Sequence, residues 1–437
     1  MFTCNSCGTI YNKWSGKCEG CQQWNTITQE ISNTSTSKRQ KVKPEDIFTS
    51  LKDVEDQHYQ RVLTGISEFD RVTGGGFVPG SVILLGGHPG IGKSTLMLQI
   101  LARLSQKQQC VYVSGEEGLA QIKMRASRLQ VDQDKCVLST CTNVIQLTSA
   151  LEQTKNLGVV IVDSIQTMSH PDVDAAPGTV SQVRAASQTL IDSAKRHNYI
   201  MILIGHVTKD GVFAGPKLLE HMVDTVLYFD GDGSLDYRIL RTIKNRFGAT
   251  NEIGVFEMGQ EGLIEVANPS SIFLSQDKTP VSGTAIAVSM EGTRPILCEI
   301  QTLISPSFLA SPRRVSIGYD NNRLSMLTAV LISRCKLPLG DKDIYINIAG
   351  GLTLKDTAAD LAIVAALISS LKNQPLSANT VYCGEIALSG QVRPVRMLEL
   401  RLKEAEKLGF EAIVCADHKL KGKSIDLRTI GHVLELK

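Results

Sequence analysis

The stretch Gly87-His-Pro-Gly-Ile-Gly-Lys-Ser94 decides the fold of this 437-residue chain. It fits the pattern Gly-x-x-x-x-Gly-Lys-Ser at every fixed position, and it lies between an apolar run at 81–85 and a helical pattern at 95–104. A strand, a glycine-rich loop and a helix in this order predict a loop whose backbone N–H groups surround phosphate oxygens. A glycine-rich turn without a ligand is the alternative, and the complete motif in this context disfavours it.

The loop predicts a nucleotide site that takes ATP and Mg²⁺. Lys93 would place a positive charge beside the β and γ phosphates, and the hydroxyl of Ser94 would ligate the metal. The predicted ATP-binding residues are Gly87, His88, Pro89, Gly90, Ile91, Gly92, Lys93, Ser94 and Thr95.

Polar residues at the ends of further apolar runs predict the rest of this site. The runs read as buried parallel strands at 109–114, 157–163 and 199–206. Because the carboxyl ends of parallel strands meet at one edge of a sheet, the polar residues there are expected to share the nucleotide. We expect Glu116 to orient and deprotonate the attacking water, and Asp163 to hold Mg²⁺. His206 would sense the γ phosphate.

Composition restricts the remaining possibilities. The length predicts roughly three domains, and an apolar content of 42% is ample for several cores. A formal charge of +2 excludes nucleic-acid binding through bulk charge, so such binding would need local patches. No apolar run approaches the roughly 18 residues that cross a bilayer, and the chain opens on a polar cysteine motif rather than a leader. We therefore expect a cytoplasmic protein without a membrane partner.

Four of the 11 cysteines predict a zinc site near the N-terminus. Cys4, Cys7, Cys18 and Cys21 form two Cys-x-x-Cys pairs, the arrangement of a zinc finger with four thiolate ligands. A pair of disulfides is the alternative, which a reducing cytoplasm disfavours. Trp14 and Trp24 flank the second pair and are expected to pack over the zinc, although stacking on a base or on a partner also fits.

A polar segment at 31–58 separates this finger from the rest and reads as a linker. Its basic cluster fits a solvated flexible segment, and contact with a nucleic-acid backbone is the alternative. The cluster consists of Lys38, Arg39, Lys41 and Lys43.

Several segments together resemble the bacterial RadA/Sms family, relatives of the RecA recombinases and of replicative DnaB-type helicases. They are the cysteine finger, TGISEFDRVTGGG at 64–76, YVSGEE at 112–117, GHVTK at 205–209 and the family's signature KNRFG at 244–248. The resemblance implies an α/β fold: a RecA-like P-loop ATPase core at 59–268, after a C4 zinc finger at 1–30.

The resemblance also implies roles for individual residues. Glu116 matches the catalytic glutamate of the RecA group, and Lys244 and Arg246 match the basic residues of the signature, which reach a neighbour's nucleotide. Loops at 169–179 and 209–217 hold the positions where RecA relatives carry DNA-binding loops. The first is acidic, whereas Lys209 and Lys217 offer phosphate contacts in the second.

Residues 269–437 resemble the α+β proteolytic domain of Lon. In a Lon-type site a lysine activates a serine hydroxyl, but the serine's place falls on Ala359 and the lysine's place on Glu399. Proteolysis is therefore not expected. The resemblance implies a scaffold that builds a ring and lends basic surface to DNA, for which Arg313 and Arg314 are candidates; solvated surface charges are the alternative.

These features predict a DNA-dependent ATPase that acts in recombinational repair. It would form a ring, expected to be a hexamer, translocate on single-stranded DNA and promote branch migration of recombination intermediates. The alternative is an ATP-switched repair adaptor with little motor activity. Expected partners are single-stranded DNA, branched intermediates, further copies of the chain, and a recombinase or replicative helicase.

Overall fold

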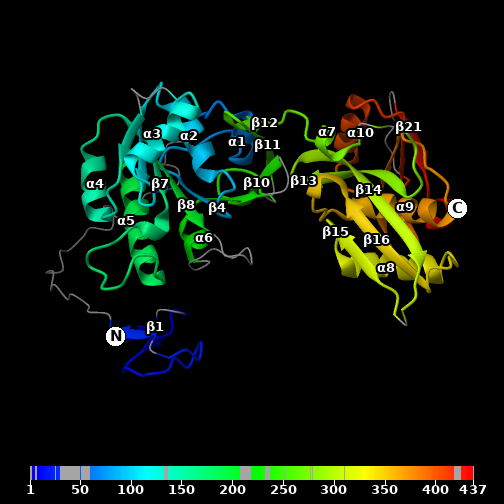
Figure 1. The fold of residues 1–437 in the computed structure, drawn as a ribbon, viewed down its shortest axis with the longest axis horizontal. Helices are drawn as coiled ribbons and strands as arrows, with labels where there is room; N and C mark the ends of the chain where they lie inside the picture. Colours follow the sequence, from blue (N-terminus) through cyan, green and yellow to red (C-terminus); the bar gives the residue numbers. More distant parts are fainter. Residues whose placement is uncertain are drawn as a thin grey trace. The chain divides into compact units, whose positions relative to one another are not determined.

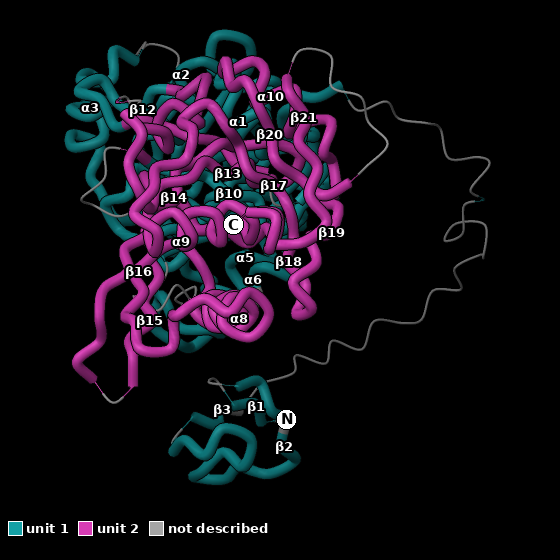
Figure 2. Tube along the Cα trace, turned by 90° about the vertical axis from the view of Figure 1, so that its right-hand side faces the viewer, with its two compact units in different colours: residues 1–231, 238–250, 258–264 teal, residues 232–237, 251–257, 265–437 magenta. Residues whose placement is uncertain are grey.

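The computed structural model describes residues 2–4, 7–24, 26–29, 50, 60–131, 136–206, 218–231, 237–250, 252–275, 277, 279–309, 311–417 and 425–436. The chain divides into two compact units, each described by itself below (Figure 2). The first unit holds residues 1–231, 238–250 and 258–264, and the second holds 232–237, 251–257 and 265–437. Among the described residues, no helix combines the length and apolar content needed to cross a bilayer.

The N-terminal residues form a small antiparallel sheet, in which Cys4 ends the first strand, whereas Cys7, Cys18 and Cys21 lie between strands. Its strand order is β2-β1-β3, so the first strand is central. The strands are β1 (Phe2–Cys4), β2 (Ile10–Tyr11) and β3 (Ile27–Gln29).

The phosphate-loop strand lies inside a nine-stranded sheet of order β12-β11-β10-β9-β4-β8-β7-β5-β6 (Figure 1). The strands from β9 to β6 in this order are parallel, and β10 pairs with β9 in the antiparallel direction. The parallel strands are β4 (Val82–Gly87), β5 (Gln109–Ser114), β6 (Cys136–Ser139), β7 (Leu157–Asp163), β8 (Ile200–His206) and β9 (Thr225–Asp230); the others are β10 (Tyr237–Asn245), β11 (Ile253–Gly259) and β12 (Gly262–Glu265).

Helices cover both faces of the parallel part of this sheet, which explains why its strands are apolar throughout. Alternate residues such as Leu84, Val113 and Val162 pack on one face against α4 (Val144–Glu152) and α5 (Val180–His197). The opposite face carries α2 (Lys93–Leu104), which contacts β4, β5 and β7. The remaining helices of this unit are α1 (Ser67–Val72), α3 (Leu119–Arg128), α6 (Leu218–Met222) and the 3₁₀ helix at Ile165–Thr167. The sequence predictions of strands at 109–114 and 157–163 and of a helix after the loop are confirmed.

The second unit is built on a seven-stranded mixed sheet of order β15-β16-β14-β13-β17-β20-β21. Along β13 and β14, side chains alternate between two layers, and Val288 and Leu297 pack with Leu402 of α10. The strands are β13 (Thr284–Glu291), β14 (Arg294–Pro306), β15 (Arg314–Ile317), β16 (Lys342–Ile348), β17 (Thr380–Cys383), β20 (Ala412–Cys415) and β21 (Asp426–Thr429), with a separate hairpin of β18 (Glu385–Ile386) and β19 (Val392–Arg393).

Helices of the second unit contact the central strands β13 and β14 of this sheet. A 3₁₀ helix at Thr357–Ala359 directly precedes α9, which begins at Asp360. The helices are α7 (Ser270–Phe273), α8 (Asn321–Ser333), α9 (Asp360–Lys372) and α10 (Leu398–Lys407), with 3₁₀ helices at Ala349–Gly351 and Val433–Leu436.

Candidate nucleotide site and zinc site

The phosphate loop connects the end of β4 to the start of α2. Gly92 immediately precedes the helix with φ of 112°, a left-handed conformation that favours glycine. A side chain there would also meet the Met258 methyl carbon at 3.0 Å. The N-terminus of α2 therefore faces the loop, where the helix dipole favours an anion.

Lys93 is the first residue of α2, and its side chain is buried. Its Nζ donates hydrogen bonds to the carbonyl oxygens of Gly87 at 2.7 Å and His88 at 2.9 Å. Burial lowers the pKa of Lys93 to about 8, against the opposing influence of Asp163 and Glu116. The ammonium group is thus held at the loop, close enough to both carboxylates for their charges to act on it.

Asp163 ends β7 beside Ser94, as the sequence predicts for a shared metal site. The Ser94 hydroxyl donates to Oδ2 of Asp163 at 2.6 Å, and the buried Tyr112 hydroxyl donates to the same oxygen at 2.5 Å. Burial and the neighbouring Asp163 raise the pKa of Tyr112 well above its usual value. Mg²⁺ is bound by hard oxygen ligands, so a serine hydroxyl and a carboxylate next to a phosphate loop fit this ion.

Glu116 follows β5 and lies where β5, β7 and β8 end. The Ser164 hydroxyl donates to its Oε1, and His206 Nε2 lies 2.9 Å from the same oxygen. The backbone just before Glu116 lies close against Thr167. Position 115 therefore needs glycine, because a Cβ there would come within 1.9 Å of the Thr167 hydroxyl oxygen. The side chain of Glu116 is 41% exposed, which leaves it accessible to water and to a nucleotide. Three carboxyl ends of strands therefore meet as predicted.

Lys244 and Arg246 lie at the opposite edge of the same sheet, the edge where its parallel strands begin. Lys244 pairs with Val226 of β9, and Arg246 binds Asp224, whose other carboxylate oxygen accepts from the N–H of Val82 at 3.1 Å. Val82 begins β4, whereas the phosphate loop follows the end of β4. At about 3.3 Å per residue, β4 separates the two edges by about 16 Å. The structure does not bring these two cations to the phosphate loop of their own chain.

Lys244 and Arg246 also differ in how they are held. The Nζ of Lys244 donates to the carbonyl oxygens of Glu220 and Val223, each at 2.7 Å, so this ammonium group caps the end of α6. Arg246 Nη1 lies 3.1 Å from the buried carboxylate of Asp224, and its side chain remains 54% exposed. Of the two, Arg246 has the more exposed side chain.

The turn after β10 packs against the glycine-rich turn at 73–76, so two segments that share the family resemblance are neighbours. A Cβ on Gly248 would lie 3.1 Å from the Cα of Gly74. Asn245 donates to the carbonyl oxygen of Thr73, and Arg61 donates to that of Phe247. These contacts fix the backbone from which Arg246 projects.

The four cysteine sulfurs near the N-terminus lie within 4.8 Å of one another. The Cys4 and Cys21 sulfurs are 3.7 Å apart, and those of Cys7 and Cys18 are 3.4 Å apart. Tetrahedral zinc with Zn–S bonds of about 2.3 Å places its sulfurs about 3.8 Å apart, so the four thiols fit this metal. All four are free thiols in this structure, which argues against the disulfide alternative.

Packing around this site differs from the sequence prediction. Phe2, Tyr11 and Ile27 pack with the cysteines, and the Tyr11 hydroxyl lies 3.1 Å from the Cys18 sulfur. Trp14 and Trp24 are 62% and 69% exposed, so the expectation that they cover the zinc site is wrong. The smaller aromatic and aliphatic side chains already fill the space, and the indole rings remain in solvent.

We expect Cys7→Ser to release zinc and unfold only the finger. Serine is a poor zinc ligand, and a module this small has too little core to fold without the metal. The measurements are zinc content and ATP turnover without DNA, the first falling and the second unchanged. Cys141→Ser, a half-buried cysteine outside the cluster, is the matched control. A drop in DNA-free turnover for Cys7→Ser alone would contradict independent folding of the finger.

The predicted DNA-binding residues have different outcomes. Lys209 and Lys217 lie outside the described residues. Arg313 is exposed, and Arg314 begins β15 with a half-buried side chain.

The Lon-type positions lie in different surroundings. Ala359 is buried at the end of a 3₁₀ helix, whereas Glu399 is exposed in the first turn of α10 and forms an ion pair with Lys403 at 3.0 Å. The neighbouring Asp360 is fully buried, and Tyr319 and Arg323 satisfy its carboxylate. These contacts are structural, and neither position offers a serine nucleophile or an amine base.

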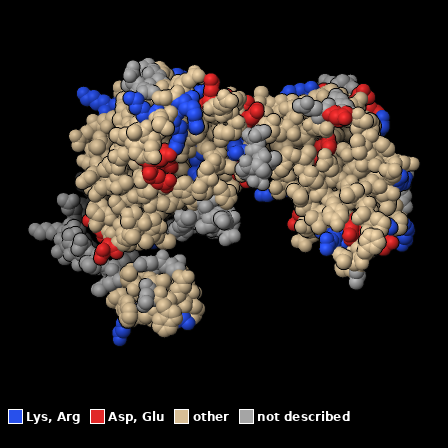
Figure 3. All heavy atoms as spheres, in the orientation of Figure 1, with Lys and Arg blue, Asp and Glu red and all other residues tan. Residues whose placement is uncertain are grey.

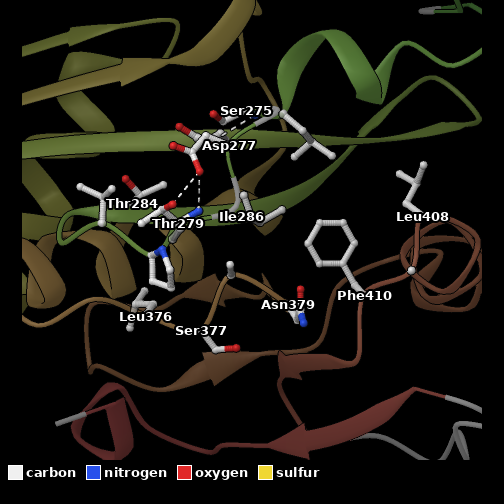
Figure 4. A pocket seen from close by; sticks show the side chains of 17 residues that line it. Ser275, Asp277, Thr279, Thr284, Ile286, Leu376, Ser377, Asn379, Leu408 and Phe410 are labelled. Carbon is white, nitrogen blue, oxygen red and sulfur yellow. Dashed lines mark hydrogen bonds between the residues drawn. The ribbon is translucent and has the colours of Figure 1, made fainter.

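The second unit also contains a pocket of about 110 Å³ beside the start of β13 (Figure 4). Phe410 and Leu408 line one side, and Ser275 and Asp277 line another. Asp277 is already engaged by the backbone N–H and hydroxyl of Thr279, and Glu299 accepts from the N–H of Ser275. The pocket lining thus has its carboxylates satisfied within the unit.

A parallel sheet with a phosphate loop, a carboxylate at each of two neighbouring strand ends and a separate four-cysteine cluster define a P-loop ATPase with a zinc ribbon. Family models agree: "AAA domain" matches residues 51–212, and "Rubredoxin metal binding domain" matches residues 2–29. A third model, "Subunit ChlI of Mg-chelatase", matches residues 322–419. The Lon resemblance of this region stays a prediction.

The chain belongs to the RadA family of DNA repair proteins. It is 49% identical over 422 residues to DNA repair protein RadA of Brucella abortus (strain 2308), covering 94% of this chain and 90% of the relative. It is 46% identical over 444 residues to DNA repair protein RadA of Bacillus subtilis (strain 168), covering 99% and 97%.

Solved structures that resemble about half of the chain include the RadB recombinase and a KaiC-like protein from the hyperthermophilic archaeon Pyrococcus horikoshii. The first is 23% identical with a TM-score of 0.39, covering 47% of this chain and 99% of that one. The second is 20% identical with a TM-score of 0.40, covering 48% and 99%.

Proposed function

We propose that this chain is a DNA-dependent ATPase of recombinational repair that works as a ring, expected to be hexameric, and translocates on single-stranded DNA to promote branch migration. Its further partners would be branched recombination intermediates and a recombinase or replicative helicase. The cytoplasmic location and the division at residues 30, 58 and 268 stay predictions.

One observation carries the proposal: the two halves of the predicted catalytic machinery lie at opposite edges of one sheet. Lys93, Glu116 and Asp163 surround the phosphate loop, while Arg246 projects from the far edge with half of its side chain exposed. Arg246 therefore supports a nucleotide site shared with a neighbouring copy. A head-to-tail contact between unlike edges closes into a ring when its rotation closes.

The residues suggest a division of work at the shared site. Lys93 binds the β and γ phosphates, and Glu116 accepts a proton from the attacking water. Ser94 and Asp163 would hold Mg²⁺, which neutralises charge on the phosphate oxygens when bound. His206, which contacts Glu116, would connect the γ phosphate to the loop that follows β8. Lys244 acts as a positioning residue that holds the end of α6.

Arg246 would add a positive charge to the transition state in the neighbour's site, as finger residues do in other phosphoryl-transfer enzymes. Hydrolysis at one interface could then shift the DNA loops at 169–179 and 209–217. Residues 269–437 would serve as a Lon-like scaffold with basic surface at Arg313 and Arg314. An ATP-switched adaptor that recruits repair proteins is the second candidate, favoured by the separate zinc ribbon.

We expect single-stranded DNA to stimulate ATP turnover in a saturable way, and Arg246→Ala to abolish the stimulation while ATP binding persists. Mixing Arg246→Ala with Lys93→Ala tests the shared site. In a mixed ring, about a quarter of the interfaces would combine an intact Lys93 with an intact Arg246 from the neighbour. DNA-stimulated turnover should therefore reappear in the mixture, although each variant alone lacks it.

The outcomes separate the readings. If the mixture shows no DNA-stimulated turnover, Arg246 does not act at a neighbour's nucleotide site. It would then act within its own subunit or have no role in turnover. Turnover that ignores DNA would favour the adaptor, as would a failure to move the branch point of a model junction.

A further inference from the structure

We propose that Trp14 and Trp24 form a platform on which bases of single-stranded DNA stack. They are the only tryptophans in the chain, and both are mostly exposed. Both rings lie next to Gly16: a Cβ at that position would be 3.6 Å from the Trp24 ring and 3.8 Å from the Trp14 ring. Two large aromatic surfaces therefore stand together in solvent on one small metal-stabilised module.

The structure accounts for why the rings stay exposed. Phe2, Tyr11 and Ile27 already fill the space around the cysteines, so the indoles contribute nothing to that core. Gly16 has no side chain to separate them, and the isolated bridge between Lys17 and Trp24 fixes the backbone beneath one ring. Exposed aromatic rings held in place by a rigid backbone are the usual stacking surface for unpaired bases.

Charge favours nucleic acid as the occupant. The charged residues of segment 2–29 are Lys13, Lys17 and Glu19, so both cations flank Trp14 in the sequence. The Nζ of Lys17 lies 5.8 Å from the centre of the Trp24 ring, so this ammonium places a positive charge beside the indole, where a nucleotide phosphate would be attracted. Figure 3 shows basic atoms at the rim of this module. Stacked bases in a duplex are not available to such a platform, which restricts the ligand to single strands.

The inference rests on the proposed function only in choosing DNA as the ligand. Because the chain has no other tryptophan, tryptophan fluorescence of the full-length protein reports on this site alone. We expect a thymidine oligonucleotide to quench it with saturation. An abasic oligonucleotide of the same length carries the same phosphates without bases and should bind about tenfold more weakly. Absent quenching, or equal quenching by the abasic strand, overturns the proposal.

Variants test each ring by the anisotropy of a labelled thymidine oligonucleotide. Trp14→Ala and Trp24→Ala should each raise the Kd about tenfold, whereas the phenylalanine replacements keep a stacking ring and most of the affinity. Lys17→Ala should make the negative slope of log K against log salt shallower by about 0.7. Phe308→Ala removes a 97% exposed ring from the second unit and should change nothing. Zinc content shows whether each variant keeps the folded module.

ATP turnover in the same samples separates this inference from the proposed function. If DNA stimulates ATP turnover but does not quench tryptophan fluorescence, the proposed function holds and the stacking platform is wrong. If DNA quenches the fluorescence but does not stimulate turnover, the stacking platform holds and the DNA-dependent ATPase is wrong. Alanine variants that retain zinc and bind the oligonucleotide as tightly as the unaltered chain would overturn the platform, leaving the rings free for a protein partner.

Discussion

Lys93→Ala is expected to abolish ATP turnover, with a loss of at least about 10²-fold, while the fold persists. The Lys93 ammonium is buried and directed to the loop by two carbonyl oxygens, so no neighbouring cation of the described loop can replace it. Removing one preorganised charge at a site of developing negative charge costs about this much in rate. The measurement is steady-state ATP hydrolysis, with and without single-stranded DNA.

The fold should survive because burial of the ammonium is itself unfavourable, which its lowered pKa reflects. We expect the free energy of unfolding to change by no more than about 1 kcal/mol. Lys107→Ala, an exposed lysine just after the same helix, is the matched control and should hydrolyse ATP normally. Turnover that survives in Lys93→Ala, or equal losses in both variants, would contradict the assigned role.

The sequence was sufficient to predict the nucleotide edge of the sheet. Parallel strands all present their carboxyl ends on one side, so Glu116, Asp163 and His206 had to meet once each strand had been recognised from its apolar run. The four cysteines were equally predictable, because the spacing of ligands alone defines a zinc ribbon. In both cases a local pattern determines a position in three dimensions.

Other features depend on contacts between distant segments, which local patterns do not report. Tyr112 reads as one more apolar strand residue, yet its hydroxyl donates to Asp163 on the neighbouring strand. Arg246 could be placed at the far edge only after β10 was known to run antiparallel to β9. The exposure of Trp14 and Trp24 depends on which side chains fill a very small core first, and composition does not determine that order.

Glu116→Gln is expected to reduce the turnover number by about 10² to 10⁴-fold while ATP binding is retained. Glutamine has the same shape and can still accept hydrogen bonds from Ser164 and His206, so the contacts that position the side chain persist. It cannot take a proton from water. The measurements are single-turnover hydrolysis and nucleotide affinity, because the two together separate chemistry from binding.

The adjacent residue provides the control for this assignment. Glu117 also follows β5, but its carboxylate forms an ion pair with Arg125 on α3, within its own unit. Glu117→Gln should therefore hydrolyse ATP at close to the normal rate. If Glu117→Gln is inactive and Glu116→Gln is active, the catalytic base has been placed one residue too early. If both variants remain active, another group accepts the proton. The contacts of Glu116 with Ser164 and His206 then have only a structural role.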